Sequence, residues 1–156
     1  FGRLNDIVIS WFGDANNVLK SWIDAAVKLP FTLRIAGPDA YRPDPDLIAT
    51  ACAQGAQIEL FNNSNDAARG AHVLVTDVWI SMGDEEGSRM QDLKPFQVHQ
   101  GLLNIADEKA IFLHCLPAVR ENEVTAGVID GPQSAVWDEA ENRLHAQKAI
   151  LCHLLA

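Results

Sequence analysis

The amino-acid sequence predicts an α/β fold, namely a doubly wound, Rossmann-like parallel sheet with helices on both faces, in three αβα layers. Short apolar runs rich in β-branched and aromatic residues alternate with segments whose apolar residues recur at helical spacing. The connections are short and contain Gly, Pro, Asn or Asp, as expected for crossovers between parallel strands. A chain of 156 residues is long enough for one hydrophobic core, so we expect a single domain.

In the first half of the chain, three strands are predicted to alternate with three helices. Residues 6–12 are β-branched and aromatic and end at Gly13, which indicates a strand buried on both faces. Apolar residues then recur every three or four positions, which predicts a helix over residues 18–29. The same alternation of strand and short helix continues at residues 31–36, 46–54, 57–61 and 63–69.

The second half begins with a strand at residues 72–79, which becomes polar near its end. Residues 81–90 contain two glycines and three consecutive acids without periodicity, which favours a surface loop. Helical spacing returns at residues 95–106, before a buried strand at residues 111–115. The remaining segments are predicted to be a short helix, an edge strand and a closing helix, at residues 121–127, 134–137 and 138–156.

The ends of two predicted strands carry residues capable of chemistry. Cys115 and His114 close one strand, and Pro117 then stops the backbone ladder. Asp77 lies near the end of another, where a buried carboxylate is costly unless a partner satisfies it. Ligands of open α/β sheets bind at the carboxyl ends of the strands. These residues therefore predict a site there, although burial as a packing residue is the alternative for Cys115 and a hydrogen-bonded core position is the interpretation we favour for His114.

Composition excludes several classes of function. The net charge of −9 and the lack of a basic cluster argue against nucleic-acid binding, and no apolar run is long enough to cross a membrane. Three distant cysteines argue against disulfides and a zinc site, so we expect no metal, a cytoplasmic protein, and Cys52 and Cys152 as inert packing residues. No cofactor is predicted, because neither a Gly-x-Gly-x-x-Gly nor a Walker pattern is present.

Four polar segments at strand ends, or in the turns beyond them, carry a resemblance to a known family. They are Asp-Ala-Asn-Asn at 14–17, Asp-Val-Trp-Ile-Ser-Met-Gly at 77–83, His-Cys-Leu-Pro-Ala at 114–118 and Glu-Asn-Arg-Leu-His-Ala-Gln-Lys at 141–148. In this order they resemble the second, amino-acid-binding domain of the ornithine carbamoyltransferases, over essentially the whole chain. The segment at 77–83 is the most discriminating, because it marks ornithine as the substrate among transcarbamylases.

The resemblance implies transfer of a carbamoyl group from carbamoyl phosphate to the side-chain amine of L-ornithine. That amine, with an ordinary pKa of about 10.4, must lose a proton before it attacks. The catalytic residues implied are Asp77 and Cys115, which orient the amine and assist its deprotonation, and Arg143, which stabilises developing negative charge. The implied ornithine contacts are Asn17, Asp77, Ser81 and Met82, and the implied carbamoyl phosphate contacts are Cys115, Leu116 and Arg143.

Simpler roles remain open for three of these residues. Asn17 could cap the first helix, Ser81 could be a turn residue, and Arg143 could pair with Glu139 one helical turn before it. Residues 81–90 are similar to the family's closing lid.

The resemblance also implies a second half. The family's N-terminal domain supplies a Ser-x-Arg-Thr phosphate cradle and most contacts of a homotrimer, and this motif does not occur here. Residues 1–156 are therefore interpreted as the ornithine-binding domain alone, inactive by itself. The alternatives are a non-catalytic amino-acid-binding module on this fold, or a transcarbamylase for a related amine such as putrescine. Arginine biosynthesis is favoured over breakdown only as the commoner role.

Overall fold

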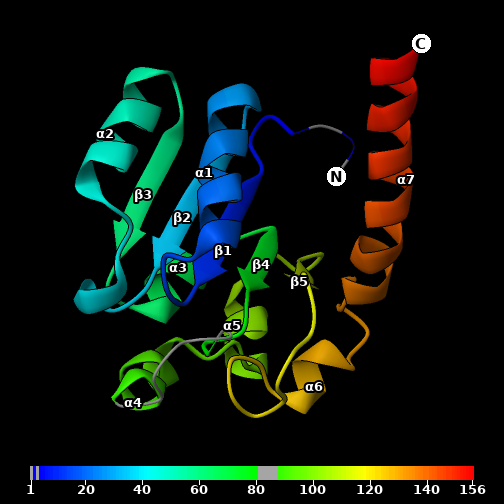
Figure 1. The fold of residues 1–156 in the computed structure, drawn as a ribbon. Coiled ribbons are helices and arrows are strands. Elements are labelled where there is room, and N and C mark those ends of the chain that lie inside the picture. Colours follow the sequence, from blue (N-terminus) through cyan, green and yellow to red (C-terminus); the bar gives the residue numbers. More distant parts are fainter. Residues whose placement is uncertain (1, 3, 81–87) are drawn as a thin grey trace.

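A single sheet of five parallel strands organises the protein, whose structure is a computed structural model describing residue 2, residues 4–80 and residues 88–156 (Figure 1). The strand order is β3-β2-β1-β4-β5. The strands are β1 Val8–Phe12, β2 Thr32–Ala36, β3 Gln57–Phe61, β4 Val73–Thr76 and β5 Ile111–His114. The chain winds outward from β1 to one edge, then returns to the centre and winds to the other. This order confirms the predicted doubly wound, Rossmann-like fold.

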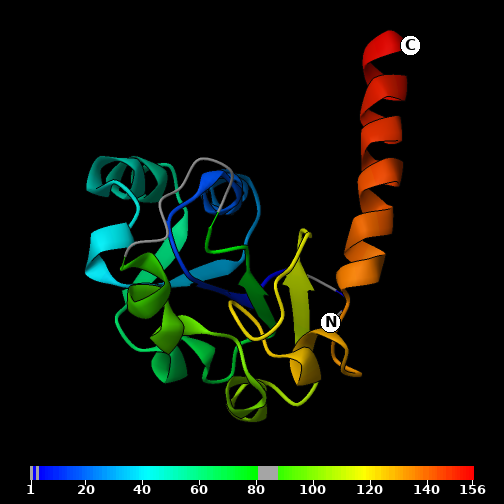
Figure 2. The same cartoon turned by 60° about the horizontal axis from the view of Figure 1, so that its bottom comes forward.

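Helices cover both faces of the sheet. Figure 2 shows α1 (blue) and α2 (cyan) together on one side, and the buried residues divide into two clusters, one on each face. Consecutive strand residues alternate between them, so Leu74 packs with α3 and α5 whereas Val75 packs with α1 and α2. The helices are α1 Asn17–Lys28, α2 Pro45–Ala53, α3 Ser64–Ala68, α4 Arg89–Leu93, α5 Gln100–Ile105, α6 Ala126–Ile129 and α7 Val136–Leu155, with 3-10 turns η1 Asp39–Tyr41 and η2 Lys94–Phe96.

The start of α1 is fixed by Asn16. Its side-chain oxygen accepts hydrogen bonds from the backbone N–H groups of Val18 and Leu19, at 2.9 and 3.1 Å. Asn17 is the first residue of the helix and not its cap, so the capping role considered for Asn17 is wrong. An amide oxygen at this position satisfies donors that the first helical turn leaves without partners.

Two predicted helices are wrong in extent. The helix predicted over residues 95–106 is limited to α5, because Val98 is extended and forms a parallel bridge with Val124. The same bridge explains why residues 121–124 are not helical and why α6 begins only at Ala126. The apolar spacing of residues 96–105 thus comes from buried side chains on two kinds of backbone, an extended segment at Val98 and the helix α5.

Other expectations also differ from the structure. The edge strand predicted at residues 134–137 is a single bridge between Ser134 and Phe112, and α7 begins at Val136. The surface loop predicted at residues 81–90 ends before residue 90, because Arg89 is the first residue of α4. Residues 81–87 of this predicted loop fall outside the described part of the chain. The strand predicted at residues 72–79 ends at Thr76. Cys52 and Cys152 are exposed and are therefore not packing residues.

Helix α7 projects from the body of the domain (Figures 1 and 2). Val136 at its start is buried against the sheet, whereas most of the later side chains are exposed. Its exposed large apolar side chains are Trp137, Leu144, Ile150, Leu151, Leu154 and Leu155. Among the described residues, no helix is both long enough and apolar enough to traverse a bilayer.

Replacement of Leu74 by alanine should destabilise the domain far more than the matched change at Leu60. Leu74 is fully buried between β4 and the helices, so Leu74→Ala should lower the free energy of unfolding by about 2–5 kcal/mol. Leu60 on edge strand β3 is 41% exposed, so Leu60→Ala should cost about 1 kcal/mol or less. Urea denaturation measures both, and equal losses would contradict the packing described here.

Candidate functional site at the carboxyl edge of the sheet

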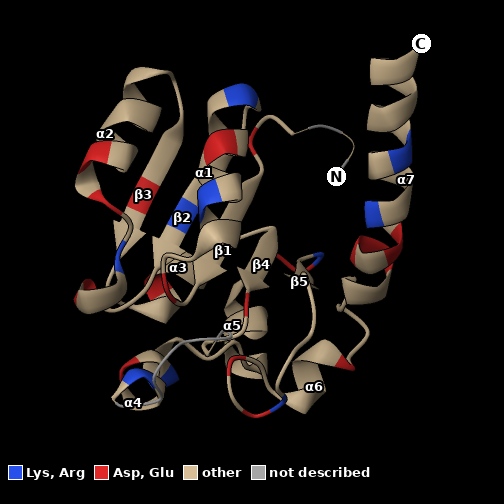
Figure 3. Cartoon of the chain, viewed as in Figure 1, with Lys and Arg blue, Asp and Glu red and all other residues tan. Residues whose placement is uncertain are grey.

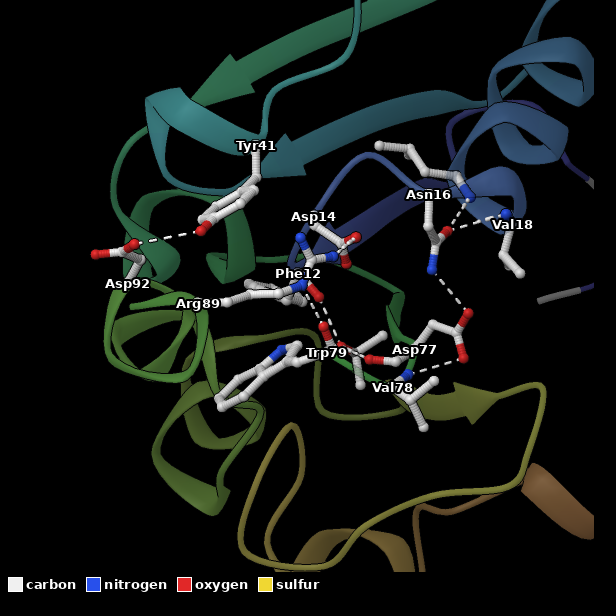
Figure 4. Close-up of polar contacts among 12 residues, drawn as sticks. Phe12, Asp14, Asn16, Val18, Tyr41, Asp77, Val78, Trp79, Arg89 and Asp92 are labelled. Carbon is white, nitrogen blue, oxygen red and sulfur yellow. Dashed lines mark hydrogen bonds and ion pairs between the residues drawn. The ribbon is translucent and has the colours of Figure 1, made fainter. Parts of the chain in front are cut away.

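The turns that follow β1, β4 and β5 meet at the carboxyl edge of the sheet, where Asp77 is the common partner. Its Oδ2 accepts a hydrogen bond from Asn16 Nδ2 at 2.8 Å, and its Oδ1 accepts one from Cys115 Sγ at 3.2 Å (Figure 4 shows Asn16 and Asp77). The backbone N–H of Val78 also donates to Oδ1, at 2.8 Å. The structure thus brings together the predicted pair Asp77 and Cys115, and adds Asn16.

These three hydrogen-bond donors offset the free-energy cost of burying the Asp77 carboxylate. The residue is only 8% exposed, and an unpaired carboxylate at such a position would lose its hydration without compensation. Hydrogen bonds to a charged acceptor are stronger than those between neutral groups. The arrangement therefore holds a negative charge in a fixed orientation at the edge of the sheet.

Cys115 is held as a protonated thiol. Burial raises its pKa to about 12, and the negative charges of Asp77 and Glu139 act in the same direction. At neutral pH the sulfur therefore donates to Asp77 and does not act as a thiolate. This state suits a residue that orients a reactant, and it does not suit a covalent nucleophile.

His114 is a buried core residue with a hydrogen bond, as interpreted from the sequence. Its Nδ1 accepts the backbone N–H of Leu116 at 3.0 Å, and its side chain is fully buried. Nε2 faces the buried Glu123 carboxylate at 3.4 Å, a separation longer than a well-formed hydrogen bond. The ring thereby fixes the backbone of Leu116 beside Cys115.

Glu139 is a neighbour of the site that the sequence analysis missed. Its Oε2 accepts the backbone N–H of His114 at 2.8 Å, so the first turn of α7 is joined to the end of β5. Burial raises the pKa of Glu139 and outweighs the lowering by the hydrogen bond from His114. Nothing in the local sequence pattern distinguishes this acid from the other acids of α7.

Arg143 does not join the group around Asp77 in this structure. It is exposed, one helical turn beyond Glu139 on the projecting part of α7, whose basic residues are blue in Figure 3. Leu116 lies next to Cys115 with its N–H bonded to His114. Two other predicted contacts, Ser81 and Met82, lie outside the described residues.

Asn17, the residue after Asn16, borders two hollows. One has a volume of about 310 Å³ and extends along α1, and the other, of about 470 Å³, reaches Tyr41 and Arg89. Cys115 lines neither of them. The larger of these two hollows is big enough for an amino-acid-sized ligand beside Asn17, and Asp77 is not among its lining residues.

A second polar cluster, also missed from the sequence, fastens α4 to the turn after β1. The Arg89 guanidinium donates to Asp14 Oδ2 and to the backbone oxygen of Trp79, and it lies 4.8 Å from the centre of the Tyr41 ring (Figure 4). Burial raises the pKa of Asp14 and outweighs the lowering by Arg89. The ion pair therefore fixes α4, the first described element after residues 81–87, beside the site.

Potential metal ligands occur together but are already engaged. Ligand atoms of Asp77, His114 and Cys115 lie within 4.8 Å of one another. However, the thiol donates to Asp77, and His114 Nδ1 accepts from Leu116. A metal ion would have to displace hydrogen bonds or a proton, so this group is not preorganised for metal binding.

Comparison with known proteins places the chain in a family. Residues 5–154 match the family described as aspartate/ornithine carbamoyltransferase, Asp/Orn binding domain. The chain belongs to this family. Its relatives include the ornithine carbamoyltransferase of Halorhodospira halophila, which is 48% identical over 99% of this chain and 51% of the relative. The ornithine carbamoyltransferase of Rhodopseudomonas palustris is 50% identical over 96% of this chain and 48% of the relative.

Solved structures of this family share the fold. The ornithine carbamoyltransferase of Gloeobacter violaceus superposes with a TM-score of 0.89 at 42% identity, covering 100% of this chain and 54% of that chain. The ornithine carbamoyltransferase of Pyrococcus furiosus superposes with a TM-score of 0.88 at 43% identity, covering 96% of this chain and 50% of that chain. The chain therefore spans about half the length of these relatives.

In this family member, the Cys115 thiol should be much less reactive than Cys52 and Cys152, which are exposed. We expect slow alkylation of Cys115 at pH 8, because its pKa of about 12 leaves almost no thiolate. Asp77→Asn removes a negative neighbour and should lower the pKa of Cys115 and speed alkylation. Mass spectrometry of alkylated peptides measures the rates, and a fast wild-type Cys115 would contradict the assigned protonation state.

Proposed function

We propose that residues 1–156 form the ornithine-binding domain of an ornithine carbamoyltransferase. The reaction transfers the carbamoyl group of carbamoyl phosphate to the side-chain amine of L-ornithine, giving L-citrulline and phosphate. The observation that carries this proposal is the buried Asp77 carboxylate, bonded to Cys115 and Asn16 at the carboxyl edge of the sheet in a member of this family. A fixed anion is the group expected to bind and orient a cationic amine.

The chemistry divides between the substrates and the chain. After the ornithine ammonium group loses a proton, its nitrogen attacks the carbamoyl carbon, a C–N bond forms, and the C–O bond to phosphate breaks. The nitrogen gives up a second proton as citrulline forms. Asp77 orients the amine and assists its deprotonation, and the Cys115 thiol, which keeps its proton at neutral pH, acts as a hydrogen-bond donor. No covalent bond to the enzyme is needed.

The remaining substrate contacts are proposed from the family resemblance. Asn17, Ser81 and Met82 hold the amino-acid head of ornithine, and the hollow beside Asn17 supports this placement of the head. Cys115, Leu116 and Arg143 contact carbamoyl phosphate. Because Arg143 is exposed on the projecting helix, it reaches the phosphate only when α7 or a neighbouring subunit brings it closer to Cys115.

A second domain is proposed to complete the site. The relatives are about twice as long as this chain, and α7 exposes leucines along the part of the helix that projects from the body. We assign the other half to an N-terminal, carbamoyl-phosphate-binding domain, with a homotrimer as the full assembly and arginine biosynthesis in the cytoplasm as its setting. The net charge of −9 favours approach of the cationic amino acid.

Citrulline formation should require both halves. The purified chain should form none from ornithine and carbamoyl phosphate, and it should become active when mixed with the carbamoyl-phosphate-binding half of a relative. Asp77→Asn should reduce this activity by a factor of roughly 10² or more, because the amine loses its orienting anion. Asp24→Asn, at an exposed acid of α1, is the matched control and should retain activity.

The outcomes separate the candidate functions. Citrulline formed by the chain alone would contradict the need for a second half. Ornithine binding without activity, in a mixture shown to associate, would favour the non-catalytic binding module. A preference for putrescine in the active mixture would favour the related transcarbamylase.

A further inference from the structure

The orientation of the Asn16 amide is determined by the helix that it caps. Its Oδ1 accepts two backbone N–H groups of α1, from Val18 and Leu19. Only the oxygen of an amide can accept these bonds, so the NH₂ group has to point away from the helix. The cap therefore aims two N–H donors from Asn16 toward the carboxyl edge of the sheet.

Asp77 is the acceptor that these donors reach. Asn16 Nδ2 lies 2.8 Å from Asp77 Oδ2, and the contact joins residues 61 positions apart in the sequence (Figure 4). The bond runs from the turn after β1 to the turn after β4, across the point where the strand order reverses. The start of α1 and the Asp77 carboxylate thus occupy a fixed relative position.

A count of hydrogen bonds on Asp77 indicates which oxygen is available for a ligand. An ionised carboxylate offers about four acceptor positions, two on each oxygen. Oδ1 uses both of its positions, for Val78 N–H and the Cys115 thiol. Among the described residues, Oδ2 accepts from Asn16 alone, which leaves it one position.

We propose that Asn16 is a positioning residue of the ornithine site: through its hydrogen bond it holds the Asp77 carboxylate so that one acceptor position of Oδ2 faces the reacting amine. This inference rests on the proposed function for the identity of the amine. Asn16 acts through Asp77, and its second task is to cap α1. If Asn16 only capped α1, a variant that keeps the cap would bind ornithine as the parent does. If Asn16 also positions Asp77, the same variant would bind ornithine more weakly.

The test uses Asn16→Ser, which preserves an N-cap oxygen but has no N–H that reaches Asp77. Calorimetric titration with L-ornithine should show a dissociation constant raised by roughly ten- to a hundredfold, the range expected when a hydrogen bond to a charged group is lost. The matched control is Asn63→Ser, because the exposed Asn63 caps α3 in the same way, through Asn65 and Asp66 N–H. The control should leave ornithine binding unchanged.

A second readout does not depend on ornithine. In the background Cys52→Ser, Cys152→Ser, the rate of Cys115 alkylation, measured by mass spectrometry as a function of pH, titrates the Cys115 thiol. If Asn16 holds Asp77 in place, Asn16→Ser lets the carboxylate rotate away from the sulfur, and Cys115 should titrate at lower pH than in the parent. A cap without a positioning role leaves this titration unchanged.

The outcomes distinguish this inference from the proposed function. Unchanged ornithine binding and thiol titration in Asn16→Ser would overturn the positioning role. Failure of the parent to bind ornithine, with a shifted thiol titration in Asn16→Ser, would support the hold on Asp77 and overturn the assignment of ornithine. If Asn16→Ser does not fold, Asn16→Asp keeps an equally good cap and replaces the donor with a negative charge, and unchanged binding there would overturn the inference.

Discussion

Burying the Asp77 carboxylate would be strongly unfavourable without donors, and three separate segments supply them. The turn before α1 contributes Asn16, the end of β4 contributes the N–H of Val78, and the end of β5 contributes Cys115. Because each bond is directional, satisfying this one charge fixes three turns relative to one another. The energetic requirement of a buried anion and the geometric precision of the site therefore have the same origin.

Strand register determines which residues can meet around that anion. Phe12 pairs with Thr76, and Thr76 pairs with His114, so β1, β4 and β5 end at the same level. Asp77 and Cys115 each directly follow a paired residue, which makes them neighbours on adjacent strands. The Thr76 hydroxyl donates to Phe12 O at 2.6 Å, which adds a bond between the ends of β4 and β1. A shift of one residue in the pairing of β4 with β5 would separate the thiol from the carboxylate.

The sequence predicts those features that depend on local pattern. Short runs rich in apolar residues located the five strands, and polar residues at strand ends led to Asp77 and Cys115. The helix expected over residues 95–106 was wrong because burial of Val98 in an extended bridge leaves the same apolar spacing as a helix face. Asn16 and Glu139 were missed as members of the site, because their roles depend on side-chain reach between elements distant in the sequence.

The charges around Cys115 bear on how the proposed reaction would be divided between this chain and a second domain. Among the described residues, the charged side chains acting on the Cys115 thiol are Asp77 and Glu139, both acidic, and the guanidinium of Arg89 is engaged by Asp14. Such surroundings suit a cationic amine but oppose the negative charge that develops on a departing phosphate. If the proposed reaction holds, cations for that phosphate would have to approach from outside this group, as Arg143 would from α7. In the proposed reaction the carboxyl edge would therefore select the amine, and phosphate stabilisation would depend on the proposed second domain.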